Sequence, residues 1–164
     1  MTYTKEEAKR NIKELVVRFR TNIDVYKKLA YNEAQVRREF IDPFFEALGW
    51  DVSNKQGHAE QYKEVVLEDT IKVGRSTRAP DYSFRIGGQR KFFVEAKRPA
   101  VNIKEDVRPS YQLRRYAWSA KLPLSIVTDF EEFSVFDCQM KPGPTGKPGI
   151  GRIAYYTFDD YLDT

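Results

Sequence analysis

The sequence predicts a single α/β domain, in which helices pack on a central mixed sheet of about five strands. Its 164 residues, 41% hydrophobic and 14% aromatic, suit one domain with a sizeable core. The first part of the chain has apolar residues at helical spacing, whereas the later part has short apolar runs separated by turn residues. The resulting order of helices, strands, helix and strands is typical of a mixed sheet with helices on it.

The N-terminal segment, residues 1–49, predicts two helices. Thr4 and Glu7 form a capping-box pattern, and apolar residues at helical spacing after them predict a helix from about 5 to 29. Asn32 can cap the second helix, which Gly49 ends. A proline inside this second helix predicts a kink.

Residues 50–157 predict the α/β core, with a hairpin turn at Gly87-Gly88 and a helix over about 104–120. The expected strands lie within 50–62 and at 64–73, 79–86, 90–97, 122–129, 132–138 and 152–158. Residues 141–151 form a Gly/Pro-rich loop, and residues 159–164 look like the start of another helix. We therefore expect the chain to be a piece of a longer polypeptide.

The composition excludes several classes of function. A single cysteine, Cys138, forms neither an internal disulfide nor a zinc cluster, which favours a reducing, cytoplasmic location. His58 is the only histidine, which argues against zinc hydrolases and most Ser-His-Asp enzymes. The net charge of +4 is a modest bias toward polyanions. No apolar run is long enough to predict a membrane span.

Three charged side chains converge on one end of the hairpin. Glu95 and Lys97 alternate with core residues along one strand, so they share a face. Asp81 lies on the neighbouring strand. A straight pairing of 86 with 89 would place it opposite Val94, whereas a bulge or a stagger of one residue places it beside Glu95.

Two adjacent carboxylates do not both ionise easily unless a cation lies between them. Mg²⁺, or Mn²⁺ in its place, supplies that charge and prefers oxygen ligands, and the main-chain carbonyl of Ala96 is a further candidate ligand. Lys97 would then lie near the attacking water and a phosphate. The alternative is an ordinary solvent-facing Glu-x-Lys ion pair, which the apolar context of "FFVEAK" disfavours.

The chain resembles the PD-(D/E)xK nuclease superfamily, because "PD" at 80–81 is followed by "EAK" at 95–97. More narrowly, it is similar to the N-terminal nuclease domains of type I restriction subunits and of type IIG restriction-methyltransferase fusions. The further matching stretches are "NEAQVRREFIDPFFEALGWD" at 32–51, "QLRRY" at 112–116 and "LPLSIVTDFEEFSVFD" at 122–137. The resemblance implies a restriction-endonuclease-like fold.

The resemblance also implies roles for individual residues. Asp81 and Glu95 would bind Mg²⁺, and Lys97 would assist the attacking water. Glu33 would lie close enough to help hold the metal, although acidic residues also favour the first turn of a helix for electrostatic reasons. Glu39 is the rival to Glu33 on the same helix.

Gln112 and Tyr116 lie on one helical face and would steady the site or contact the DNA backbone; the alternative is a polar stripe beside a core tyrosine. Seven cations could line a cleft for DNA, with solvated surface as the alternative for each: Arg75, Arg78, Arg98, Lys104, Arg108, Arg114 and Arg115. The acidic turn "DFEEF" at 129–133 is expected to carry solvated charge.

The resulting expectation is a Mg²⁺-dependent endonuclease that cleaves double-stranded DNA, as the cutting module of a restriction-modification enzyme. Its partners would be methyltransferase and target-recognition domains, with a transient dimer on DNA. Two alternatives remain: a RecB-like repair exonuclease module, and a non-catalytic binding module on the same fold.

Overall fold

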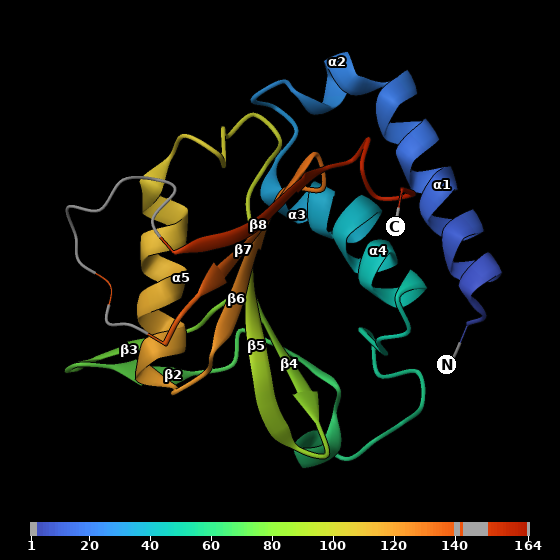
Figure 1. The fold of residues 1–164 in the computed structure, drawn as a ribbon. Coiled ribbons are helices and arrows are strands. Elements are labelled where there is room, and N and C mark those ends of the chain that lie inside the picture. Colours follow the sequence, from blue (N-terminus) through green and yellow to red (C-terminus); the bar gives the residue numbers. More distant parts are fainter. Residues whose placement is uncertain (1–2, 140–141, 143–150, 164) are drawn as a thin grey trace.

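A six-stranded mixed sheet forms the centre of the molecule, and helices cover both of its faces (Figure 1). The structure is a computed structural model that describes residues 3–139, 142 and 151–163. Helices α1, α3 and α4 lie on one side of the sheet, and α5 lies on the other. This architecture is the restriction-endonuclease-like α/β fold that we expected, with six strands in the central sheet instead of about five.

The helical elements are α1 (Lys5–Thr21), α2 (Ile23–Tyr26), α3 (Glu33–Val36), the π-helix η1 (Arg37–Ile41), α4 (Asp42–Ala47), the 3-10 helix η2 (Glu60–Tyr62) and α5 (Val107–Ser119). The strands are β1 (Val65–Leu67), β2 (Ile71–Val73), β3 (Ser76–Arg78), β4 (Tyr82–Ile86), β5 (Gln89–Ala96), β6 (Leu124–Thr128), β7 (Glu132–Asp137) and β8 (Arg152–Thr157). The order across the sheet is β1-β4-β5-β6-β7-β8. Among the strands that the structure describes, only β5 and β6 run parallel, with α5 as the connection between them.

The predicted strand over 64–73 is in fact two strands. The chain breaks at Glu68, whose φ of 53° is a left-handed conformation that no continuous strand adopts. The first half joins the central sheet as β1, whereas the second half pairs with β3 in a separate two-stranded ribbon. The break therefore sets a small ribbon apart, packed against α5.

Three other expectations were wrong. Within 50–62 there is no strand among the described residues, only the short turn of η2. Residues 159–163 form turns and not a helix. The helix expected over 5–29 ends at Thr21, because the side chain of Asn22 bonds the carbonyl of Arg18 (3.2 Å) and its backbone leaves the helical region. Most of the loop over 141–151 lies outside the described residues.

The second helix begins as predicted, but it changes its winding in the middle. Asn32 caps α3 through a complete capping box. The π-helix follows, and Pro43 lies in the first turn of α4. Because Pro43 has no N–H, the carbonyl of Glu39 four residues earlier accepts instead from Nη2 of Arg18, at 2.6 Å. Gly49, with φ of 104°, follows the end of the helix.

Two hydrophobic clusters, one on each face, hold the helices to the sheet. On one face the helices pack on β4 and β5 through residues such as Phe40, Phe45 and Phe84. On the other face, Leu113 and Ala117 of α5 pack on β5, β6 and β7. Among the described residues, no helix combines the length and the apolar character needed to cross a membrane.

Candidate active site

A β-bulge in the β4–β5 hairpin brings the two predicted carboxylates together. The pairs are Ile86↔Gln89 and Arg85↔Arg90 before the bulge, and Phe84↔Phe92, Ser83↔Phe93 and Tyr82↔Val94 after it. Lys91 is the extra residue. Continuing this register by one step places Asp81 beside Glu95. The backbone N–H of Ala96 donates to Oδ2 of Asp81 at 2.8 Å, which fixes that carboxylate at the end of the hairpin.

Glu95 is a buried acid that the protein leaves partly unsatisfied. Its side chain is on the α5 face of the sheet, next to Phe93, and only 9% of the residue is exposed. Oε2 has no hydrogen-bond partner. Burial, followed by the charge of Asp81 and a hydrogen bond to it, raises the pKa of Glu95 to about 9. In the absence of a divalent cation, burial beside Asp81 therefore favours the protonated form of Glu95 at neutral pH.

Glu33, the first residue of α3, belongs to the same cluster. Burial raises its pKa, as do the charge of Asp81 and a hydrogen bond to it, whereas Lys97 and Arg37 lower it. Glu39, its rival, faces elsewhere, because its carboxylate accepts from the hydroxyl of Tyr31 at 2.6 Å. The capped start of α3 thus brings Glu33, and not Glu39, to the hairpin.

Lys97 follows the last residue of β5 and supplies the positive charge of the cluster. Its backbone N–H donates to the carbonyl of Thr128 on β6 at 3.0 Å, which keeps it in line with the sheet. Its ammonium lowers the pKa values of both Glu33 and Glu95. Ala96, between the two charged residues, is fully buried, and its carbonyl stays a predicted ligand.

The structure brings Tyr116 to the cluster but leaves Gln112 outside it. Burial raises the pKa of Tyr116, with further contributions from Glu95 and then Asp81, so the phenol lies within electrostatic range of both acids. Gln112 has an exposed side chain one turn earlier. Nothing in the described part of the chain ties it to the carboxyl groups.

Arg37 is a residue of this site that the sequence did not reveal. Its Nη1 lies 3.7 Å from Oδ1 of Asp81, and its Nη2 lies 3.5 Å from the Asp81 carbonyl. The guanidinium stacks over the Tyr82 ring, 4.8 Å from the centroid, and the Tyr82 hydroxyl donates to Asp42. The available signal was the four-residue spacing from Glu33, which places both side chains on one face of the helix.

Comparison with known proteins finds a family model that matches part of this chain. Residues 63–143 match the model of the type I restriction enzyme R protein N terminus. This segment is a domain of that restriction-enzyme family. It contains the hairpin acids, Lys97 and Tyr116, whereas Glu33 lies before it.

A relative extends the likeness beyond the restriction domain. The chain is 38% identical over 157 residues to the type II restriction enzyme and methyltransferase RM.Eco57I of Escherichia coli. The aligned residues make up 94% of this chain and 16% of that protein, so the chain spans about a sixth of its relative. No solved structure matches the chain.

The acidic side chains of this cluster fit a hard divalent cation. Oε2 of Glu95 is a buried oxygen without a partner, and burial, followed by the charge of Asp81, raises the pKa values of both Glu33 and Glu95. However, within the described ranges no three acidic, histidine or cysteine side chains are close enough to form a ready-made metal site. Fewer than three side-chain ligands are thus in place together, which leaves room for main-chain oxygen or water.

The acidic turn at 129–133 does not carry the solvated charge that we expected. Asp129 and Glu132 are buried, and the backbone N–H of Glu132 donates to the Asp129 carboxylate at 2.7 Å. Glu131 pairs with Lys27 at 2.7 Å. The turn closes the β6–β7 hairpin of the restriction domain through its own acidic side chains, so it has a structural explanation.

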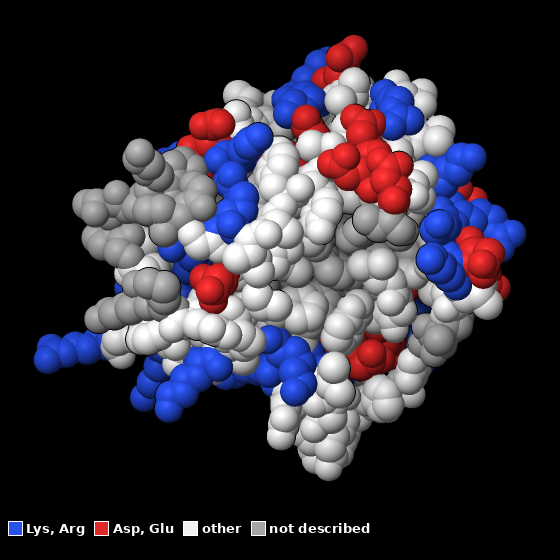
Figure 2. Space-filling model, viewed as in Figure 1, with Lys and Arg blue, Asp and Glu red and all other residues white. Residues whose placement is uncertain are grey.

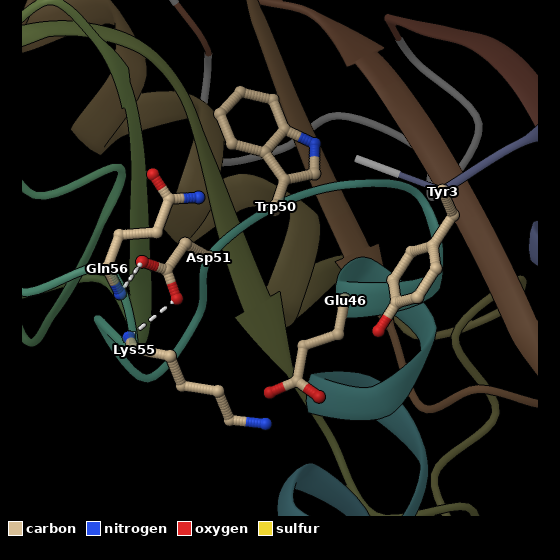
Figure 3. A pocket seen from close by; sticks show the side chains of 6 residues that line it. All are labelled: Tyr3, Glu46, Trp50, Asp51, Lys55 and Gln56. Carbon is tan, nitrogen blue, oxygen red and sulfur yellow. Dashed lines mark hydrogen bonds between the residues drawn. The ribbon is translucent and has the colours of Figure 1, made fainter. Parts of the chain in front are cut away.

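A separate hollow of about 320 Å³ lies beyond the end of α4 (Figure 3). It is lined by Tyr3, Glu46, Trp50, Asp51, Lys55 and Gln56. The Asp51 carboxylate accepts from the backbone N–H groups of Lys55 (2.8 Å) and Gln56 (3.0 Å), as the dashed lines show. The Asp51 carboxylate therefore holds a loop in place. None of the predicted site residues lines this hollow.

Proposed function

We propose that the chain is the cleavage module of a restriction-modification enzyme, a Mg²⁺-dependent endonuclease acting on double-stranded DNA. The observation that carries this proposal is the pair Asp81 and Glu95, aligned by a bulge and left with an unpartnered buried oxygen. Lys97 directly follows the end of β5, two positions after Glu95, so side-chain alternation would direct both side chains to the same face. The restriction-enzyme family of residues 63–143 and the restriction-methyltransferase relative favour the same conclusion.

Asp81 and Glu95 would hold Mg²⁺, or Mn²⁺ in its place, with the Ala96 carbonyl as a main-chain ligand and Glu33 as a helper. Bound there, the cation supplies a Lewis acid for the phosphate oxygens and compensates the negative charge of the acids. Glu95 would hold the cation as a carboxylate, so it would give up its proton to solvent on binding. Arg37 holds Asp81 from the other side through its carboxylate and its carbonyl.

Lys97 would donate a hydrogen bond to the attacking water and to a phosphate oxygen. The water oxygen bonds to phosphorus and loses a proton to solvent, while the bond from phosphorus to the 3′ oxygen breaks. The leaving 3′ oxygen takes up a proton, so the products are a 5′-phosphate and a 3′-hydroxyl. Tyr116 would support Glu95 from α5, and Gln112 would contact the DNA backbone from the exposed side of that helix.

Cleavage of both strands needs two such sites, so a transient dimer on DNA is part of the proposal. Methyltransferase and target-recognition functions would come from other domains. The relative is named as both a restriction enzyme and a methyltransferase, and the chain aligns with only 16% of it.

The test is a plasmid-nicking assay with Mg²⁺ or Mn²⁺ against EDTA. Lys97→Ala should slow metal-dependent cutting by about 10²–10³-fold, because it removes one stabiliser of the transition state. Lys91→Ala is the matched control, since Lys91 is an exposed lysine in the bulge of the same strand and should keep wild-type cutting.

Each rival function has its own outcome in the same assay. A repair exonuclease would degrade linear DNA from its ends and leave closed circles intact. A binding module would retain DNA without metal-dependent cutting. If Lys97→Ala cuts as fast as wild type, the assignment of this hairpin is wrong.

A further inference from the structure

The structure sorts the seven cations that could line a DNA cleft. Four of them are engaged within the fold. Arg98 donates to a backbone carbonyl, Lys104 lies over a tyrosine ring, Arg108 pairs with Asp106, and Arg114 is buried with only 4% of the residue exposed. These four side chains have roles in the fold, so a surface for DNA must be sought among the remaining ones.

Two of the remaining cations lie on the ribbon of β2 and β3. Residues 71–78 read IKVGRSTR, with three basic residues and no acidic one. All three basic side chains, Lys72, Arg75 and Arg78, are exposed, as is the whole of β3. Among the described residues, no acidic side chain forms an ion pair with any of them. The ribbon therefore presents uncompensated positive charge.

The ribbon is anchored and not a loose loop. Ile71 and Val73 alternate with the exposed Lys72 and are buried in the same cluster as Leu113 and Ala117 of α5. Lys and Arg side chains project over this part of the surface, at the lower left of Figure 2, where Figure 1 places β2 and β3. The basic side chains are thus held at a fixed place relative to α5.

The ribbon leads directly to the carboxyl cluster. Arg78, at the end of β3, comes three residues before Asp81, a span of at most about 10 Å. Its charge lowers the pKa of Tyr116, the same tyrosine that feels Glu95. The turn at Arg75 is about 10 Å further along the ribbon at ~3.3 Å per residue. The ribbon thus reaches at most about 20 Å from the acids, which is about six base pairs of duplex at 3.4 Å each.

Helix α5 lies beside the turn of the ribbon. A hollow of about 540 Å³ lies between the ribbon turn and the helix, lined by Val73, Gly74, Tyr111, Arg115, Trp118, Ser119 and Pro142. Arg115, another of the seven cations, is exposed and lies over the Tyr111 ring at 5.5 Å, a contact of the same kind as that of Lys104. Arg115 thus supplies positive charge on the helix side of the hollow, and on the ribbon side Arg75 directly follows the lining residue Gly74.

We propose that the β2–β3 ribbon is an arm that binds the phosphate backbone of duplex DNA beside the cleavage position. Lys72, Arg75 and Arg78 each take a phosphate, and Arg78 contacts the one nearest the acids. The arm rests on the proposed function only for the identity of its substrate, because its contacts to phosphate need no metal.

The test is the salt dependence of binding to a 30-bp duplex, measured by fluorescence anisotropy in EDTA, where no cutting occurs. Arg75→Ala/Arg78→Ala should reduce the slope of log K against log salt by about two, since each phosphate contact contributes about 0.9. At low salt the same variant should bind about tenfold or more weakly. In Mg²⁺ it should need more DNA for half-maximal cutting.

The matched control is Arg10→Ala/Lys13→Ala, which removes the same two charges from exposed positions of α1. This helix lies at the opposite side of the molecule from the ribbon (Figure 1). It should keep the wild-type slope. An unchanged salt slope in the ribbon variant overturns the proposal. An equal reduction of the salt slope in the α1 variant also overturns it, because the effect would then depend on net charge alone.

The two failures are distinguishable. If the wild type cuts in Mg²⁺ and the ribbon variant keeps the wild-type salt slope, the arm is wrong and the nuclease assignment stands. If the wild type shows ribbon-dependent binding in EDTA but never cuts with metal, the arm stands and the nuclease assignment fails. If the wild type does not bind the duplex at low salt, the arm is also wrong.

Discussion

Two glutamates of the central sheet are equally buried and yet differ in what surrounds them. Glu95 on β5 is 9% exposed, and Glu132 on β7 is 8% exposed. The carboxylate of Glu132 accepts from the backbone N–H groups of Ile103 (2.8 Å) and Lys104 (3.3 Å), and from the hydroxyl of Tyr155 (2.7 Å). Glu95 has one oxygen without a partner.

The difference in hydrogen bonding indicates different roles for the two glutamates. Desolvating a carboxylate is costly, and Glu132 recovers that cost through three donors from a loop and from β8. Glu95 lacks such compensation, so its pKa rises to about 9. The bonds of Glu132 explain it as a structural residue, whereas the incomplete bonding of Glu95 makes it a candidate to bind a ligand.

The largest expected effect is on cutting by Glu95→Gln. This change keeps the shape of the side chain and removes its charge, so metal-dependent cutting should fall by about 10²–10³-fold. The protein should remain as stable as wild type in EDTA, because an amide is not penalised by a neighbouring carboxylate. Rates from the nicking assay and thermal melts check both halves. If Glu95→Gln cuts as fast as wild type, Glu95 has no role in metal-dependent cutting.

Glu132→Ala should affect stability and not chemistry. It leaves two backbone N–H groups and the Tyr155 hydroxyl without their acceptor, at a cost of about 3–5 kcal/mol in the free energy of unfolding. Urea unfolding measures that loss, and the nicking assay below the midpoint should show a near-wild-type rate. If Glu132→Ala is as stable as wild type, these donors find other partners, and the structural role of Glu132 is contradicted.

The pH dependence of stability should also report the burial of Glu95, as a smaller effect. The pKa of Glu95 is raised in the folded protein, so folding takes up a proton between about 4.5 and about 9. Its contribution to stability is full below the unfolded pKa and is lost as the pH rises through this window. In EDTA, the melting temperature of wild type should therefore fall relative to Glu95→Gln from pH 5 to pH 9. A constant difference between the two proteins would contradict the raised pKa.

The sequence predicted the acid pair because local rules determine it. The Gly87-Gly88 turn sets the hairpin, with both glycines at positive φ (58° and 82°), and the alternation of side chains then assigns Glu95 and Lys97 to one face. Of the two registers left open, the structure has the bulged one. The capping box at Asn32 was likewise a local pattern.

The rest depends on contacts between distant segments. Arg37 meets Asp81 only when the helical segment packs on the sheet, and a spacing along one helix does not reveal that. Glu132 looked solvated because its donors, Ile103 and Lys104, come from a loop almost thirty residues away in the sequence. The apolar pattern over 64–73 predicts one strand, so it does not reveal the break at Glu68 that sets the ribbon apart.

The bulge at Lys91 has a consequence for how such sites are sought in other sequences. In a straight hairpin closed by the pair 86 and 89, the numbers of facing residues always sum to 175, so their separation is odd. After the bulge the sum is 176, as for 82 and 94, and the separation becomes even. Asp81 and Glu95 are 14 positions apart (95 − 81). One extra residue has changed the parity of the separation, so a search built on a single fixed spacing would pass over hairpins with the same facing acids.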